Sequence, residues 1–169
     1  MLLIVDANVL IDYAKTEAGI LALCVRHLGP IHVPSVVLDE VEQLDAAGCR
    51  RLGLTLIDEP LEILDEASQK SGALSFQDHV CLALAKANGW VCVSNDKPLH
   101  RACEREGVRT LWGLRLMIEL AACGALGAEQ AKAIALDIHT LNPKHITPAI
   151  IDRFDAEIDR ATSRNTTYP

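Results

Sequence analysis

The sequence is poor in aromatic side chains, which make up only 4% of its 169 residues. Because hydrophobic residues still reach 50%, the core must be built from the aliphatic side chains of Leu, Val, Ile and Ala. This composition is typical of a globular protein and excludes a disordered one. A chain of this length fits one domain, or one domain with a small appendage, and can bury roughly two thirds of its unfolded surface.

The cysteines form no C-x-x-C pair, since no two of the six are closer than eleven positions. This spacing excludes the usual zinc-binding pair. Most of the cysteines stand inside apolar stretches, where cysteine acts as a small hydrophobic residue. We therefore expect reduced thiols and a cytoplasmic protein.

Long apolar runs, a basic leader and an excess of positive charge are also missing. No run approaches the ~20 residues of a membrane span, and the chain reaches Asp6 without a basic residue. We expect neither a signal peptide nor a membrane segment. The net charge of −7 argues against non-specific binding to nucleic acid or to anionic membranes. It does not exclude a metal-dependent nuclease, because bound cations invert the charge of a carboxylate site.

Short apolar strands alternate with helices through about residue 112. The expected strands are residues 2–5, 31–33, 54–57, 90–93 and 108–111. The expected helices between them are residues 9–15, 19–27, 35–47, 61–70, 75–88 and 98–106. This alternation predicts an α/β domain with a central parallel sheet. In such a sheet, ligands bind at the carboxyl ends of the strands.

From residue 113 onward the pattern becomes helical only. The expected helices are residues 114–123, 128–140 and 147–161. We expect residues 113–162 to form an extension that packs on the domain of residues 1–112 or makes the interface of a homodimer. The polar tail of residues 163–169 is expected to be frayed.

Two acids follow predicted strands. Asp6 comes directly after the first strand, and Asp96 comes shortly after the strand at residues 90–93. Both are therefore expected at the ligand-binding edge of the sheet. Each also has a simpler interpretation, because Asp is a favoured N-cap and a helix follows both positions.

Glu40 is expected on a helix. If residues 35–47 are helical, Glu40 lies on the same inward face as Val37 and Val41. An isolated carboxylate on a buried face needs a cation, a hydrogen-bond partner or a shift to the neutral form. The alternative is a Glu at the rim of the apolar face that reaches solvent.

Asp78 stands three residues after Ser75, in the pattern of a capping box. An acid in the first turn also complements the helix dipole, which explains it without any catalysis. However, the following helix is apolar all round and must be buried. Its N-terminus is then expected to open near the strand ends, beside Asp6.

Together, these acids and their neighbours resemble the PIN-domain family. The segments that carry the resemblance, in the family's order and at its usual spacing, are VDANVLID at residues 5–12, Glu40, LSFQD at residues 74–78 and VSNDKPL at residues 93–99. The resemblance covers about residues 1–112. It implies a three-layer α/β/α domain whose parallel sheet of about five strands is flanked by helices.

The resemblance also implies a function and a set of roles. It implies a metal-dependent endoribonuclease that hydrolyses RNA to a 3′-hydroxyl and a 5′-phosphate. The residues that would bind Mg²⁺ or Mn²⁺ and act in catalysis are Asp6, Glu40, Asp78 and Asp96. Asn8 and Ser94 match positions that support the acids through hydrogen bonds. Asp12, in the first segment, is interpreted as a solvated helix residue.

Many small PIN proteins are the VapC-like toxins of type II toxin–antitoxin pairs, and the resemblance therefore implies a cognate antitoxin protein as a partner. The helices after residue 113 depart from a compact toxin. The alternative function is a PIN-fold binding or scaffold module without turnover. Loss of an acid would favour that alternative, but all four are present.

Lys97, Arg101 and Arg105 follow one another at every fourth position of a predicted helix. They would form a basic stripe that begins beside the acids and could hold RNA phosphates. The alternative is an ordinary solvated face. His79 and His100 stand near the proposed acids in the sequence and could contact substrate, or they are ordinary polar residues.

Overall fold

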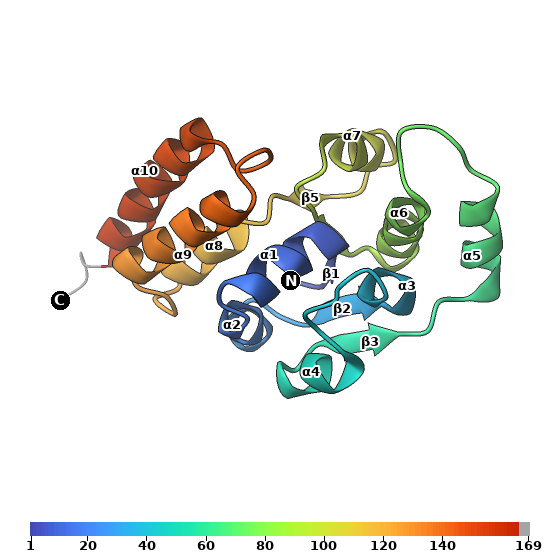
Figure 1. The fold of residues 1–169 in the computed structure, drawn as a ribbon, viewed down its shortest axis with the longest axis horizontal. Coiled ribbons are helices and arrows are strands. Elements are labelled where there is room, and N and C mark those ends of the chain that lie inside the picture. Colours follow the sequence, from blue (N-terminus) through green and yellow to red (C-terminus); the bar gives the residue numbers. More distant parts are fainter. Residues whose placement is uncertain (166–169) are drawn as a thin grey trace.

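Five short parallel strands form the centre of the computed structural model, which describes residues 1–165 (Figure 1). The strand order across the sheet is β3-β2-β1-β4-β5. The strands are β1 (Leu3–Val5), β2 (Ile31–Pro34), β3 (Thr55–Ile57), β4 (Val91–Val93) and β5 (Thr110–Leu111). The predicted parallel sheet flanked by helices is confirmed.

The central strands are buried on both faces, which explains their continuous apolar sequence. Every residue of β1 and β4 is buried, whereas β3 at the edge of the sheet is partly exposed. The two buried strands pair with each other in parallel, Leu3 opposite Val91 and Val5 opposite Val93. Their carboxyl ends therefore finish at the same level in the middle of the molecule.

Helices cover both faces of the sheet (Figure 1). Those between the strands are α1 (Ala7–Lys15), α2 (Gly19–His27), α3 (Ser35–Leu38), α4 (Ala46–Arg51), α5 (Leu61–Ser68), α6 (Phe76–Asn88) and α7 (Lys97–Arg105). On one face α2 packs on β2, and on the other α6 packs on β1 and β4. This two-sided arrangement follows from right-handed crossovers that run in opposite directions from β1.

The predicted single helix over residues 35–47 is wrong. The chain instead forms the short helices α3 and α4, joined by turns. The backbone N–H groups of Glu40, Val41 and Leu44 each bond to the carbonyl three residues back, not four. Asp45 then begins α4, because its side chain accepts a hydrogen bond from the Gly48 backbone N–H at 2.6 Å. An Asp that caps a new helix competes with continuation of the old one.

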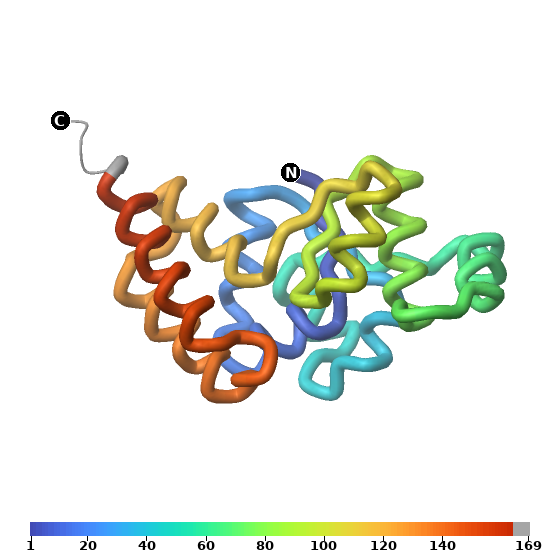
Figure 2. The backbone as a smooth tube through the Cα atoms, turned by 90° about the horizontal axis from the view of Figure 1, so that it is seen from above, coloured from blue at the N-terminus to red at the C-terminus, as the bar shows by residue number. Residues whose placement is uncertain are grey.

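Three helices follow the sheet: α8 (Arg115–Ala122), α9 (Ala128–Leu141) and α10 (Pro148–Asn165). Helix α10 packs on α8 and α9, while α8 contacts α2 and α9 contacts α1. Figure 2 shows the orange and red helices side by side at one end of the molecule. The first residues of the expected frayed tail belong to α10, and residues 166–169 lie outside the described residues. No helix within residues 1–165 combines the length and hydropathy needed to cross a membrane.

Candidate active site

Asp6 and Ser94 lie next to each other at the carboxyl edge of the sheet, directly after β1 and β4. The register pairs Val5 with Val93, and the backbone N–H of Asp6 donates to the carbonyl of Val93 at 3.0 Å. This is the edge where open parallel sheets bind their ligands.

Three hydrogen bonds hold the Asp6 carboxylate. Its Oδ1 accepts from the Ala7 backbone N–H at 2.7 Å. Its Oδ2 accepts from Asn8 Nδ2 at 2.6 Å and from Ser94 Oγ at 2.8 Å. Asn8 and Ser94 therefore orient this acid through the kind of contact that the resemblance implied.

Asp6 is only 4% exposed, and burial is the main reason why its pKa is raised to about 6. The hydrogen bond from Ser94 opposes this shift, whereas the charges of Asp78 and Asp96 add to it. Both acids therefore lie close enough to Asp6 to act on its ionisation. A buried acid whose pKa is raised by burial and by like charges is a candidate functional group.

Asp96 combines the two interpretations that its sequence position allowed. Its Oδ1 accepts from the Leu99 backbone N–H at 2.8 Å and caps α7. Its own backbone N–H donates to Ser94 Oγ at 3.0 Å, and the same hydroxyl donates to Asp6. Ser94 therefore links the two acids.

Asp78 is part of a capping box at the start of α6, as predicted. Its Oδ2 accepts from the Ser75 backbone N–H at 2.8 Å, and its own N–H donates to Ser75 Oγ at 3.0 Å. The charge of Asp78 also raises the pKa of Asp6 and that of Glu40. The cap therefore places this acid near both others.

The prediction that Glu40 lies on an inward helix face is wrong. Helix α3 ends at Leu38, so Glu40 lies in the following turn and is exposed, while Val37 and Val41 are buried. Its pKa is still raised, first by partial desolvation and second by the charge of Asp78. Glu40 thus stands at the rim of the acidic group.

The chemistry of this group fits a hydrated divalent cation. Within the described part of the chain, no three His, Cys, Asp or Glu side chains converge tightly enough to enclose a metal ion directly. Carboxylate oxygens nevertheless suit hard cations, and Mg²⁺ commonly keeps several waters and uses one or two carboxylates. Burial is the main cause of the raised pKa values of Asp6 and Glu40, and a cation would relieve the repulsion between acids that adds to it. The four acids could therefore hold Mg²⁺ or Mn²⁺ partly through water.

The interpretation of Asp12 as a solvated residue is wrong, because its side chain is only 7% exposed. It accepts hydrogen bonds from Asn95 Nδ2 at 3.0 Å and from Asn142 Nδ2 at 3.1 Å. The Asn95 backbone N–H in turn donates to Asn8 Oδ1 at 3.1 Å. A chain of hydrogen bonds thus connects the end of α9 with Asp6. The sequence did not predict the contacts of Asn95 and Asn142 with Asp12, since Asp12 lies 83 and 130 positions away from them.

Glu59, just after β3, is another acid that sequence reasoning missed. Its carboxylate accepts from Ser35 Oγ at 2.7 Å and from the Val36 backbone N–H at 3.0 Å. It therefore holds the start of α3, the segment that leads to Glu40. Its place two residues after the end of β3 was the available signal.

The basic residues that the sequence singled out, Lys97, Arg101 and Arg105, are all exposed on α7. Their side chains make no ion pair with a described residue. Arg105 and His79 line a hollow between α6 and α7. Lys97 directly follows Asp96 and lies nearest to the acids along the helix.

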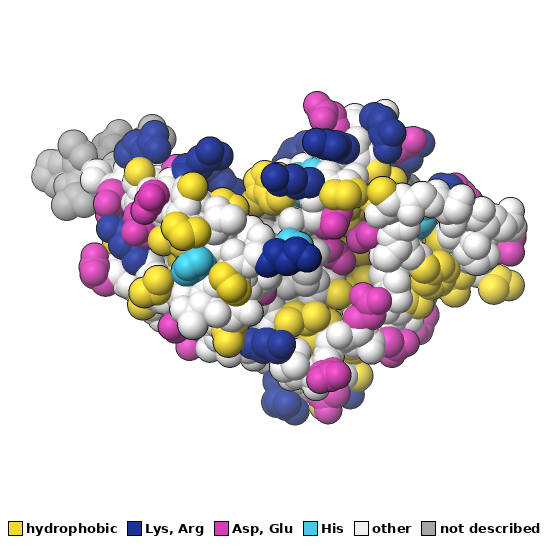
Figure 3. All heavy atoms as spheres, turned by 45° about the horizontal axis from the view of Figure 1, so that its top comes forward, with side chains coloured by type: hydrophobic (Ala, Val, Ile, Leu, Met, Phe, Trp, Pro, Cys, Tyr) yellow, Lys and Arg dark blue, Asp and Glu magenta, His cyan; other side chains and the backbone are white. Residues whose placement is uncertain are grey.

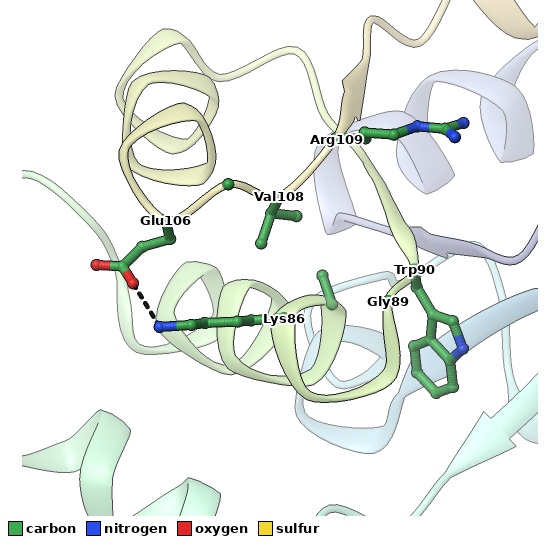
Figure 4. Close-up of a pocket in the computed structure, with 8 residues that line it drawn as sticks. Lys86, Gly89, Trp90, Glu106, Val108 and Arg109 are labelled. Carbon is green, nitrogen blue, oxygen red and sulfur yellow. Dashed lines mark hydrogen bonds and ion pairs between the residues drawn. The ribbon is translucent and has the colours of Figure 1, made fainter.

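A shallow cavity of about 230 Å³ lies at the amino ends of the strands, on the side of the sheet away from the acids (Figure 4). Trp90 and Arg109 border it just before β4 and β5, and the ion pair of Lys86 with Glu106 closes one side at 2.7 Å. None of the four proposed acids lines this cavity. Within the acidic group, Asp6 is buried, Asp78 and Asp96 are partly exposed and Glu40 is exposed.

Comparison with known proteins identifies no family for this chain. No protein-family model matches the chain, and no curated protein matches its sequence. One solved structure is similar: a PilT N-terminus domain protein from the archaeon Sulfolobus solfataricus P2, with 12% sequence identity and a TM-score of 0.49. The similarity covers 69% of this chain and 90% of that one.

Proposed function

We propose that this protein is a metal-dependent endoribonuclease. The observation that carries the proposal is the oriented Asp6 carboxylate at the carboxyl edge of the sheet. Its pKa is raised to about 6 by burial and by the charges of Asp78 and Asp96. The motif resemblance to PIN domains supports RNA as the substrate.

Each residue has a separate task in this proposal. Ser94 and Asn8 keep the Asp6 carboxylate in one orientation through their hydrogen bonds. Asp96 uses its Oδ1 and Asp78 its Oδ2 for a helix cap, so the other carboxylate oxygen of each can face a cation or its waters.

A divalent cation, when bound, neutralises charge on the phosphate and promotes attack by water. Water then adds to phosphorus and the bond to the 3′-oxygen breaks, which leaves a 3′-hydroxyl and a 5′-phosphate. Lys97 and Arg101 hold flanking phosphates through charge.

The test is cleavage of an end-labelled, single-stranded RNA by the purified protein in Mn²⁺ or Mg²⁺. We expect Ser94→Ala to lower the rate about 10–100-fold, as is typical when a hydrogen-bond partner of a metal ligand is lost. Asp6→Asn should lower it further, because the carboxylate itself is gone.

Neighbouring exposed acids provide matched controls. Asp39→Asn repeats the chemical change of Asp6→Asn at an exposed position, and Glu42→Gln removes the charge of a second exposed acid. Both variants should leave cleavage unchanged. Equal cleavage by the wild-type protein and Asp6→Asn would contradict the proposal. Such a result would also mark any observed activity as a contaminant.

A further inference from the structure

Trp112 is an exposed aromatic residue at the same edge of the sheet as the acids. It follows β5 directly, and β5 pairs with β4 so that Leu111 lies opposite Val93. The backbone N–H of Ser94 donates to the Leu111 carbonyl at 3.1 Å. Trp112 therefore leaves the sheet beside Ser94, and its side chain is 46% exposed.

The Trp112 ring is stacked on His100 of α7. The ring centroids are 3.7 Å apart and the planes differ by 11°. His100 is itself held, because its Nε2 lies 2.8 Å from the Ser94 carbonyl. One side of the indole is thus occupied by a fixed imidazole, and nearly half of the residue's surface remains open to solvent.

The backbone after Trp112 is anchored as well. The Gly113 N–H donates to Asn95 Oδ1 at 2.9 Å, and its carbonyl accepts from the Tyr13 hydroxyl at 2.8 Å. A Cβ at Gly113 would meet Asn95 Oδ1 at 3.0 Å, so the close approach favours glycine. The aromatic pair is therefore held in place before any ligand arrives.

Ser94 connects this pair to the acids. Its hydroxyl donates to Asp6 and accepts from the Asp96 N–H, while its carbonyl contacts His100. Helix α7 also carries the exposed cations Lys97 and Arg101. In Figure 3, basic side chains gather at the top of the middle of the molecule, with acidic side chains below them.

A half-exposed aromatic side chain beside cations and carboxylates matches the chemistry of an unpaired nucleotide. Bases stack on aromatic side chains with little dependence on sequence, and cations hold the adjoining phosphates. A base inside a duplex has no free face to offer. We propose that Trp112, supported by His100, is the platform on which one unpaired base of the RNA strand stacks beside the acids. This inference rests on the proposed function and deepens it.

Binding can be measured without cleavage in the Asp6→Asn background, with a 12-nucleotide oligo(A) strand as the probe. The chain has two tryptophans, so Trp90→Phe leaves Trp112 as the only one. We expect its fluorescence to be quenched as the strand binds. Trp112→Ala should weaken binding about 5- to 150-fold, which corresponds to ~1–3 kcal/mol for one stacked base. Trp112→Phe should restore most of the affinity.

Two controls separate stacking from a general surface effect. Leu136→Ala removes an apolar side chain that is 55% exposed on α9 and should not change binding. A 12-base-pair RNA duplex should bind wild-type and Trp112→Ala proteins equally. Unchanged single-strand affinity in Trp112→Ala, or Trp112 fluorescence that does not respond at saturation, would overturn the inference.

The outcomes also separate this inference from the proposed function. If the wild-type protein cleaves RNA but Trp112→Ala binds normally, the platform is wrong and the nuclease stands. If single strands quench Trp112 but no metal supports cleavage, the platform stands and the nuclease is wrong. Should Trp112→Ala fail to fold, Trp112→Phe and the fluorescence titration still decide.

Discussion

Among the individual side chains, Asp6 shows best how the fold buries a carboxylate at the candidate site although its burial is unfavourable. Burial disfavours its charged form, and the hydrogen bonds from Ala7, Asn8 and Ser94 recover only part of that cost. Because its pKa in the folded protein is raised to about 6, the folded state binds this proton more tightly than the unfolded chain does. Ionisation of Asp6 therefore opposes folding in the absence of metal.

This shift predicts how the stability of the metal-free protein depends on pH. The contribution of protonated Asp6 is fully present below about pH 4 and is lost as the pH rises through about 6. The free energy of unfolding of the wild-type protein, relative to Asp6→Asn, should therefore fall by up to about 3 kcal/mol between pH 4 and pH 7. Urea unfolding in EDTA at both pH values measures this difference. A pH-independent difference would contradict the raised pKa.

The site residues that follow strands could be predicted from the sequence. Asp6, Ser94 and Asp96 follow buried strands, and parallel strands bring their carboxyl ends together. Asp12 could not be predicted as buried, because Asn142, which covers it, belongs to a segment 130 positions away. Glu40 was misplaced because its position was derived from a helix that ends at Leu38.

Among the secondary-structure elements, the three helices after the sheet contribute a large share of the core. Phe154 and Ile158 of α10 are buried together with Leu116 and Leu120 of α8. Because α8 and α9 also contact α2 and α1, we propose that the extension unfolds together with the sheet.

A single substitution in α10 tests that proposal. Phe154 is only 3% exposed, so Phe154→Ala should lower the free energy of unfolding by about 3–5 kcal/mol through lost burial and a cavity. Both tryptophans lie before residue 113, so fluorescence reports on the sheet domain, whereas circular dichroism reports on all helices. If the extension unfolds together with the sheet, the two signals should show one coincident transition.

Leu136→Ala is the control, because the exposed Leu136 side chain should contribute little. Two separate transitions, with the fluorescence transition unmoved by Phe154→Ala, would show that the extension is an independent unit.

Apolar runs and helix periodicity were sufficient to predict all five strands and most helices. The failure at residues 35–47 has a local cause. Three-residue turns and the Asp45 cap replace the middle of the expected helix. A continuous apolar periodicity does not reveal such a break, because Val37 and Val41 are buried in either conformation.

For the molecule as a whole, the net charge is negative, but positive side chains are grouped next to the acidic site. The chain carries a net charge of −7, yet exposed cations stand on α7 next to the acidic edge. A divalent cation at that edge would reduce the local negative charge. It would thereby reduce the repulsion between the acidic edge and the phosphates of an RNA strand.

The proposed function requires that the carboxylates around Asp6 bind a divalent cation in the folded protein. Thermal unfolding with increasing Mn²⁺ tests it most directly, with Asp6→Asn and the exposed control Asp39→Asn measured in parallel. A ligand at 100 times its Kd adds about 2.7 kcal/mol, which raises the Tm of a chain of this size by about 5–10 °C. We expect that rise in the wild-type protein and in Asp39→Asn, and none in Asp6→Asn. No rise in the wild-type protein, or an equal rise in all three, would contradict the account.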